Sequence, residues 1–128
     1  MLNRSPLTTM LPVRDMDRAK DFYEHRLGLE PKGPRPDGRF DFKVGTNVLE
    51  LFPKDAPPAD YTALSFEVSD INGTIHELED HGVIFEDYDM PGLKTENHIS
   101  VMGSEKAAWF KDSEGNYLCV HEEMLPDA

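Results

Sequence analysis

An internal repeat constrains the fold of this chain more than any other feature. Residues 7–29 and 62–83 each contain a strand-like apolar run, a Val-x-Asp sequence and an amphipathic helical segment closed by glycine. Val13 matches Val68 and Asp15 matches Asp70 at one common offset, while the closing glycines, Gly28 and Gly82, depart from that offset by one residue. A repeat that occurs only twice indicates two packed modules rather than a solenoid array.

Each copy is followed by further strand-like sequence, which predicts a β-α-β-β-β module. In the first module Asp15 is the expected helix N-cap, and in the second Asp70 takes that role. The remaining strands are expected at 29–32, 39–44 and 47–52 in module one and at 83–88, 106–111 and 117–122 in module two. Residues 89–105 are expected to form one long loop, of the kind that covers or binds ligands in small domains.

The predicted fold class is α+β, with the paired β-α-β-β-β modules forming a cup-shaped, partly open sheet around a cavity. Module one covers residues 5–53 and module two covers 62–123. Residues 54–61, rich in proline and charge, form the linker within a single domain. Along 39–44 the alternation predicts one apolar face, Phe40, Phe42 and Val44, and one solvated face, Arg39, Asp41 and Lys43.

The charge balance excludes some classes of partner. The formal net charge is −12, from 25 acidic and 13 basic residues. Nucleic acids and anionic membranes are both bound through Lys and Arg, so neither is an expected partner. The acidic charge is compatible with a cationic small molecule, and it also favours solubility.

The single cysteine, Cys119, allows no intramolecular disulfide and no thiolate-rich zinc site. The N-terminal sequence lacks the apolar core and cleavage pattern of a signal peptide. No apolar run approaches the roughly 20 residues that span a bilayer. We therefore expect a cytoplasmic protein.

Together, these motifs resemble the vicinal oxygen chelate superfamily, which includes glyoxalase I, the bleomycin resistance proteins and extradiol dioxygenases. The resemblance rests on four segments that cover nearly the whole chain, MLPVRDMDRAKDFYEHRLGL, NVLELF, ALSFEVSDI and AAWFKDSEGNYLCV. It implies four metal-ligand positions, which in this sequence are Thr8, Glu50, Ala63 and Cys119. Only Glu50 is a ligand type that the metal-dependent members use, so the resemblance predicts that no metal or other cofactor is bound there.

Glu50 is the main candidate functional residue. A carboxylate on the inner face of a central strand is costly to bury unless it is paired, and burial suits it to act as a general base or as an anchor for a cation. A structural alternative is an ion pair with a nearby Lys or Arg, or a hydrogen bond to Thr8. The expected ligand-contacting residues are Thr8, Met10, Phe40, Phe42, Glu50, Phe52, Ser65, Trp109, Cys119 and His121.

Three hypotheses about function follow. The leading one is a metal-free, homodimeric protein that binds a small cationic or aromatic molecule, as the resemblance to bleomycin resistance proteins implies. The alternative is a lyase, isomerase or hydrolase that uses Glu50 as a base, or as a metal ligand with Cys119 and His121. The third is a dimeric module that binds no small molecule. Core packing is the alternative role for Trp109 and the phenylalanines.

Overall fold

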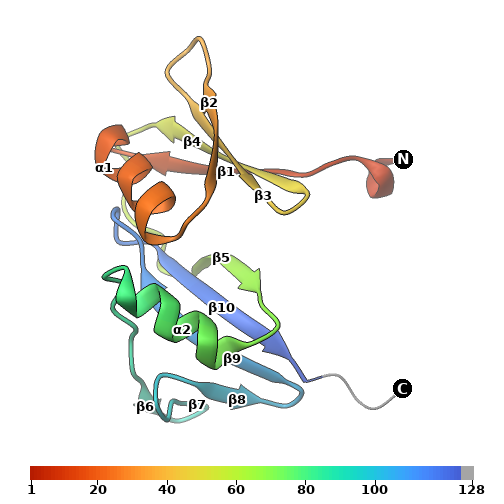
Figure 1. Ribbon diagram of the computed structural model, residues 1–128, viewed down its shortest axis with the longest axis vertical. Coiled ribbons are helices and arrows are strands. Elements are labelled where there is room, and N and C mark those ends of the chain that lie inside the picture. Colours follow the sequence, from red (N-terminus) through yellow and green to blue (C-terminus); the bar gives the residue numbers. More distant parts are fainter. Residues whose placement is uncertain (125–128) are drawn as a thin grey trace. The chain divides into compact units, whose positions relative to one another are not determined.

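A computed structural model describes residues 1–124 of the chain. Residues 1–57 form one compact unit, and residues 58–124 form a second. Each unit consists of an open four-stranded sheet and a helical segment (Figure 1). The predicted α+β class is confirmed.

The first unit has the strand order β1-β4-β3-β2. β1 runs parallel to β4, and β3 runs antiparallel to both of its neighbours. A 3-10 turn at Leu2–Arg4 precedes the sheet. The elements of this unit are β1 (Thr8–Val13), α1 (Met16–Asp21), a π-helical turn (Phe22–Arg26), β2 (Glu30–Pro34), β3 (Phe40–Val44) and β4 (Asn47–Pro53).

The second unit repeats this arrangement, with the strand order β5-β10-β9-β8. β5 runs parallel to β10, as β1 does to β4, so the two-module repeat that the sequence predicts is present in the topology. The elements of this unit are β5 (Thr62–Glu67), α2 (Ile71–Asp80), β6 (Asp89–Met90), β7 (Leu93–Lys94), β8 (Ser100–Met102), β9 (Glu105–Lys111) and β10 (Tyr117–Glu123).

Both helices begin where the Val-x-Asp sequences predict. The carboxylate of Asp15 accepts a hydrogen bond from the backbone N–H of Arg18, and that of Asp70 accepts one from Gly73, each at 3.1 Å. These bonds satisfy amides that would otherwise have no partner in the first helical turn. Gly28, just after the first helical segment, has a φ of +74°, a left-handed conformation that a glycine adopts without strain.

Two predictions about the second unit are wrong. Residues 83–88 do not form a strand, since only Phe85 makes a single bridge, to Phe110. Residues 89–105 are not one unstructured loop, because they contain the short β6–β7 pair and β8, which extends the sheet at β9. The side chain of Phe85 packs edge-on against Phe110 at 5.3 Å, so packing rather than strand pairing determines this segment.

In each unit one face of the sheet forms the core with the helical segment. In the first unit Phe42 is fully buried and its ring lies 6.2 Å from that of Tyr23 in the π-helical turn. In the second unit Glu122 Oε1 accepts a hydrogen bond from the first amide of α2, at Ile71, which places α2 on the same face of β10 as Leu118 and Val120. The opposite face of the sheet carries Glu50 in the first unit and Trp109, Cys119 and His121 in the second.

Candidate functional sites

Glu50 lies in the middle of β4, on the sheet face opposite the helix. Its register partners are Met10 on β1 and Asp41 on β3, and register partners share a face. Glu50 is only 3% exposed and Asp41 only 2%. The prediction that Asp41 lies on a solvated face is therefore wrong, because neighbouring arginines cover it.

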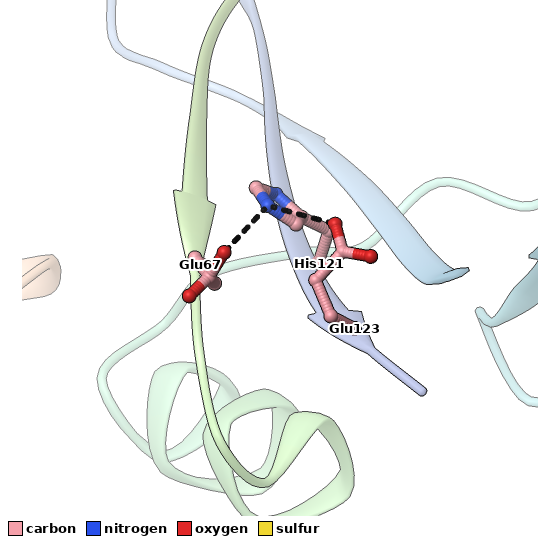
Figure 2. Close-up of side chains that lie close together, drawn as sticks. All are labelled: Glu67, His121 and Glu123. Carbon is pink, nitrogen blue, oxygen red and sulfur yellow. Dashed lines mark ion pairs between the residues drawn. The ribbon is translucent and has the colours of Figure 1, made fainter. Parts of the chain in front are cut away.

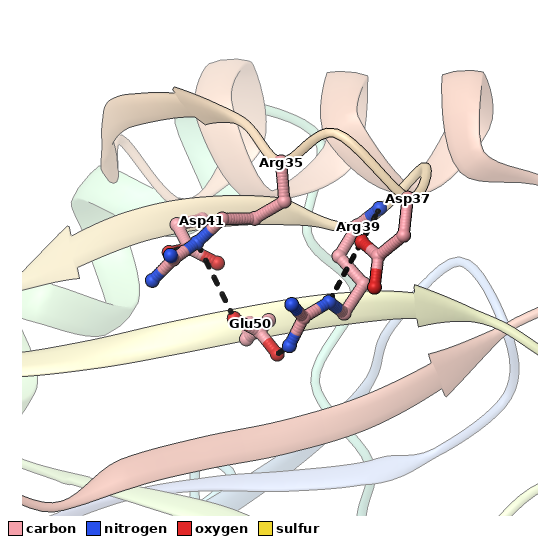
Figure 3. Close-up of polar contacts among 5 residues, drawn as sticks. All are labelled: Arg35, Asp37, Arg39, Asp41 and Glu50. Atoms are coloured by element: carbon pink, nitrogen blue, oxygen red, sulfur yellow. Dashed lines mark hydrogen bonds and ion pairs between the residues drawn. The ribbon is translucent and has the colours of Figure 1, made fainter.

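Ion pairs with two arginines compensate the buried carboxylates (Figure 3). Arg39 Nη1 donates a hydrogen bond to Glu50 Oε1 at 2.7 Å, and Arg35 Nε donates one to Asp41 Oδ2 at 2.8 Å. Arg35 Nε also lies 3.8 Å from Glu50 Oε2. Both arginines come from the turn that joins β2 to β3, so the folding of this turn places their positive charge beside the carboxylates.

A third carboxylate, that of Asp37, completes the cluster. Arg39 Nε donates to Asp37 Oδ1 at 2.8 Å, and this bond lowers the pKa of Asp37. The pKa of Arg39 is raised, mainly by this bond to Asp37 and secondly by the bond to Glu50. Arg39 is therefore a fixed cation between two anions, and Glu50 is a paired carboxylate rather than a free one.

This arrangement shows the ion pair that was the structural alternative for Glu50. A general base must be free to accept a proton, and a carboxylate oxygen 2.7 Å from a guanidinium is engaged as an acceptor. Beside it, Asp41 Oδ1 is buried and has no hydrogen-bond partner in the part of the chain that the structure describes. The cluster favours a structural role for Glu50 over proton transfer.

The strand register places the other predicted site residues of this unit on two opposite faces of the sheet. Thr8, Met10 and Phe52 lie on the same face as Glu50. Phe40 and Phe42 pair with Leu51 and Leu49 and lie on the opposite face, where Phe42 is fully buried and Phe40 is half-buried. The prediction that they line the same surface as Glu50 is wrong, because the two phenylalanines alternate with Asp41 along β3.

In the second unit the sheet face opposite α2 carries Ser65, Trp109, Cys119 and His121. Ser65 and Trp109 are the register partners of Cys119, as Met10 and Asp41 are of Glu50. Ser65 Oγ and His121 Nδ1 are 2.5 Å apart and form a hydrogen bond. The register thus brings together four of the predicted site residues.

Cys119 is only 3% exposed, and burial raises the pKa of its thiol. A metal ligand must be a thiolate, so this environment disfavours a metal at Cys119. Thr8 and Ala63, at the other two positions that the resemblance implies, supply no strong ligand, and Glu50 is engaged by Arg39. The four residues do not fit the metal that the resemblance associates with these positions.

An aromatic pocket of about 320 Å³ lies on the second unit. Trp109 forms one wall, and its Nε1 donates a hydrogen bond to Thr62 Oγ1 at 3.1 Å. Tyr88 packs edge-on against Trp109 at 5.9 Å, and burial raises the pKa of its phenol. The residues that line the pocket are Asp60, Tyr61, Thr62, Tyr88, Leu93, Trp109 and Tyr117.

Sequence reasoning found only Trp109 of this set as a site residue. Tyr117 was detectable, because strand alternation places it on the same face as Cys119 and His121. Tyr61 and Asp60 lie in the predicted linker, and Tyr88 in a predicted strand that does not form. No periodic pattern in the sequence marks these three residues.

Several solved structures share the fold of this chain. TnmS3 from Streptomyces sp. CB03234, described as an antibiotic binding protein, is 22% identical, with a TM-score of 0.74 over 96% of this chain and 98% of that one. A lactoylglutathione lyase from Agrobacterium tumefaciens is 22% identical, with a TM-score of 0.70 over 93% of each chain. SMU.1112c is 26% identical, with a TM-score of 0.73 over 94% of this chain and 99% of that one.

A sequence comparison with curated proteins gives no significant match. Among the described residues, no helix is long and apolar enough to cross a membrane. The model of the Glyoxalase/Bleomycin resistance protein/Dioxygenase superfamily matches residues 6–120. That match covers most of both modules and includes Glu50 and Trp109, so the chain belongs to this superfamily.

Proposed function

We propose that this protein binds a small organic molecule in the aromatic pocket of its second unit and acts by sequestration rather than by chemistry. The observation that carries the proposal is the pocket beside Trp109, with a volume of about 320 Å³. That volume is at the lower end of the range typical of small-molecule sites, roughly 300–1,000 Å³. The antibiotic-binding description of TnmS3 supports this class of function.

The walls of the pocket favour a flat, aromatic or cationic ligand. Tyr61, Tyr88, Trp109 and Tyr117 line it, and aromatic faces attract both other rings and cations. Asp60 is the acidic residue of the lining, and the formal charge of −12 adds a long-range attraction for cations. The hydrogen bond to Thr62 and the ring contact with Tyr88 hold Trp109 in position before a ligand binds.

Metal-dependent and base-catalysed reactions have less support. Thr8 and Ala63 replace two ligands that the metal-dependent relatives use, and Glu50 is paired with Arg39. We assign Glu50 to holding Arg39 and the β2–β3 turn in place. Sequestration needs neither a metal at these positions nor a free base.

The proposal can be tested by fluorescence, because Trp109 is the only tryptophan in the chain. Titration with proflavine, a planar aromatic cation, is expected to quench Trp109 emission with saturable, one-to-one binding. Isothermal titration calorimetry with the Tyr88→Ala variant is expected to show binding weakened by about tenfold, the size of one well-placed aromatic contact. Acridone, a planar but uncharged molecule, tests whether charge contributes.

The matched control for charge is a pair of aspartates. Asp60→Asn is expected to weaken proflavine binding, whereas Asp55→Asn makes the same change of net charge in the linker outside the pocket and is expected to leave it unchanged. Equal effects of the two variants would mean that net charge alone attracts the cation. Absence of quenching and of binding heat with both probes would contradict an aromatic or cationic ligand.

We also infer a homodimer in a reducing compartment, in keeping with the superfamily resemblance. β1 is an edge strand that carries exposed apolar side chains, with Leu7 just before it 70% exposed and Met10 within it 51% exposed. Apolar edges of this kind are favoured sites of chain association. Cys119 is a free, buried cysteine, which is typical of proteins that are kept reduced.

A further inference from the structure

Three potential metal ligands meet on the second unit, outside the aromatic pocket and outside the four positions implied by the family resemblance. They are Glu67 at the end of β5 and His121 and Glu123 on β10 (Figure 2). His121 Nε2 lies 3.9 Å from Glu67 Oε1 and 3.9 Å from Glu123 Oε1. The three donor atoms all lie within 4.8 Å of one another.

The strand register explains why these side chains converge. Glu67 is the parallel register partner of His121, and Glu123 follows two residues later on the same face of β10. Donor atoms bound to one zinc ion at about 2.0–2.2 Å lie roughly 3.4 Å apart. The side chain of Glu67 is 71% exposed and that of Glu123 is 38% exposed, so each has room for the small movement that this requires.

Ser65 orients the imidazole for such a role. Its Oγ is hydrogen-bonded to His121 Nδ1, while Nε2 of the same ring faces both carboxylates. When Nδ1 carries the proton and donates it to Ser65, the lone pair of Nε2 points towards the space between Glu67 and Glu123. A bond of this kind to the second ring nitrogen is the usual way in which proteins fix a metal-binding histidine.

The charges also favour a divalent cation. A neutral His121 with two ionised carboxylates leaves a charge of −2, which one divalent ion neutralises. Mixed imidazole and carboxylate donors suit zinc and neighbouring transition metals better than magnesium or calcium. Three protein ligands would leave a coordination position for water or an added ligand.

We propose that Glu67, His121 and Glu123 form a binding site for a divalent transition metal of the zinc class, with Ser65 as the residue that orients His121. The site goes beyond the proposed small-molecule function, which needs no metal. It also replaces the sequence-based alternative in which Glu50 and Cys119 join His121, since the partners of His121 are the carboxylates beside it.

The test uses the full-length chain, freed of any affinity tag and treated with a chelator. Calorimetry with Zn²⁺ is expected to show one ion per chain, and Co²⁺ is expected to give the visible absorption bands of a site with nitrogen and oxygen ligands. His121→Gln should abolish both signals, and Glu67→Gln or Glu123→Gln should each weaken binding. Ser65→Ala is expected to weaken binding by about tenfold, the lower end of such effects.

His98 provides a matched control because it also lies between two carboxylates. Its Nδ1 is 3.1 Å from Asp87 Oδ2 and its Nε2 is 3.6 Å from Glu79 Oε2, so no single nitrogen faces both. His98→Gln should therefore leave Zn²⁺ binding unchanged. Absence of stoichiometric binding to the unmodified chain, or equal losses in the His98→Gln and His121→Gln variants, would overturn the proposal.

The alternative role of the cluster is an ion pair between a protonated His121 and its two glutamates. In that case Zn²⁺ would not raise the melting temperature of the unmodified chain, and that result would count against the proposal. A rise that is absent in the His121→Gln variant would support it.

Discussion

Arg39 Nη1 donates a 2.7 Å hydrogen bond to Glu50 Oε1, so a guanidinium that is 35% exposed neutralises a carboxylate that is 3% exposed. The pair links the end of the β2–β3 turn to the middle of β4. The sequence resemblance implies a metal-ligand position at Glu50, and in this structure the carboxylate of Glu50 is engaged by Arg39. The chain thus retains the carboxylate of that position but uses it in an ion pair.

Replacing Arg39 by methionine should lower the urea midpoint of unfolding, because it leaves the buried carboxylate of Glu50 without its main hydrogen bond. The cost is limited because Arg35 Nε lies 3.8 Å from the same carboxylate and can move towards it. Urea denaturation followed by circular dichroism measures the change. An unchanged midpoint would show that Arg39 does not compensate the charge of Glu50.

The matched variant is Glu50→Gln, which removes the buried charge but keeps an acceptor. It should cost less than Arg39→Met, since the arginine it leaves behind is partly exposed and still bonded to Asp37. The double variant Arg39→Met with Glu50→Gln should be more stable than the sum of the two single effects predicts. Additive costs would mean that the two side chains do not interact.

Much of the fold could be predicted because local signals agreed with the packing. Asp15 and Asp70 cap their helices, and the buried residues of α2 are the apolar stripe Ile71, Ile75 and Leu78. The repeat also predicted the shared topology of the two sheets. Each helix cap and the apolar stripe depend on one short segment, and the repeat shows in two such segments of the sequence.

The rest depends on contacts between distant residues. Strand alternation predicts that Asp41 lies on the surface, but Arg35 covers it from the preceding turn. Trp109 signals an aromatic site by itself, whereas Tyr61 and Tyr88 join it only through the folded chain. Residues 83–88 alternate like a strand, yet only Phe85 pairs with the sheet. Alternation cannot reveal any of these partners.

The turn between β9 and β10 should be among the most sensitive in the chain. Asp112 Oδ1 accepts hydrogen bonds from the backbone N–H groups of Glu114, at 2.9 Å, and Asn116, at 2.8 Å, and Asp112 is 6% exposed. Asp112→Ala leaves two buried donors without these partners and should cost about 2–3 kcal/mol. Thermal and urea denaturation measure the loss.

Ser113 is the control for this turn. Its Oγ is buried without a hydrogen-bond partner among the described residues, so Ser113→Ala should be neutral or slightly stabilising. Asp112→Asn keeps one acceptor oxygen and should cost less than Asp112→Ala. Equal losses for Ser113→Ala and Asp112→Ala would show that the carboxylate bonds do not stabilise the turn.

Cys119 should react slowly with alkylating agents and should require a more alkaline pH than an ordinary thiol. Burial raises its pKa above the usual value of about 9.0, so little thiolate is present at neutral pH. Labelling with iodoacetamide across pH 7–10 should accelerate only at the high end, and urea should remove the delay. Fast labelling of the folded protein at pH 7 would contradict this environment.

The same shift predicts a stability change at alkaline pH. The pKa of the thiol is higher in the folded than in the unfolded chain, so the protonated thiol contributes to the free energy of unfolding. This contribution is fully present below the unfolded pKa, about 9.0, and is lost as the pH rises through the folded pKa. The Cys119→Ala variant lacks this contribution. The difference in stability between the two proteins should therefore shrink above pH 9 and stay constant below it.

Gly73, in the first turn of α2, should respond to substitution in a way that depends on Asp70. A glycine within a helix is normally less stable than an alanine by about 1 kcal/mol. Here, however, a Cβ at position 73 would lie 2.5 Å from Asp70 Oδ2, in the carboxylate that caps the helix. An alanine must displace this cap, which is itself worth about 1 kcal/mol, so Gly73→Ala should change the stability little.

Removing the cap should reveal the helix preference of alanine. In an Asp70→Ala background, Gly73→Ala is expected to stabilise the protein by about 1 kcal/mol, which makes the coupling between the two positions about the same size. Urea denaturation of the four proteins of this cycle measures it. As a control, Asn72→Ala at the exposed neighbouring position should have the same effect with and without Asp70. If Gly73→Ala also has the same effect in both backgrounds, the glycine does not serve to accommodate the Asp70 cap.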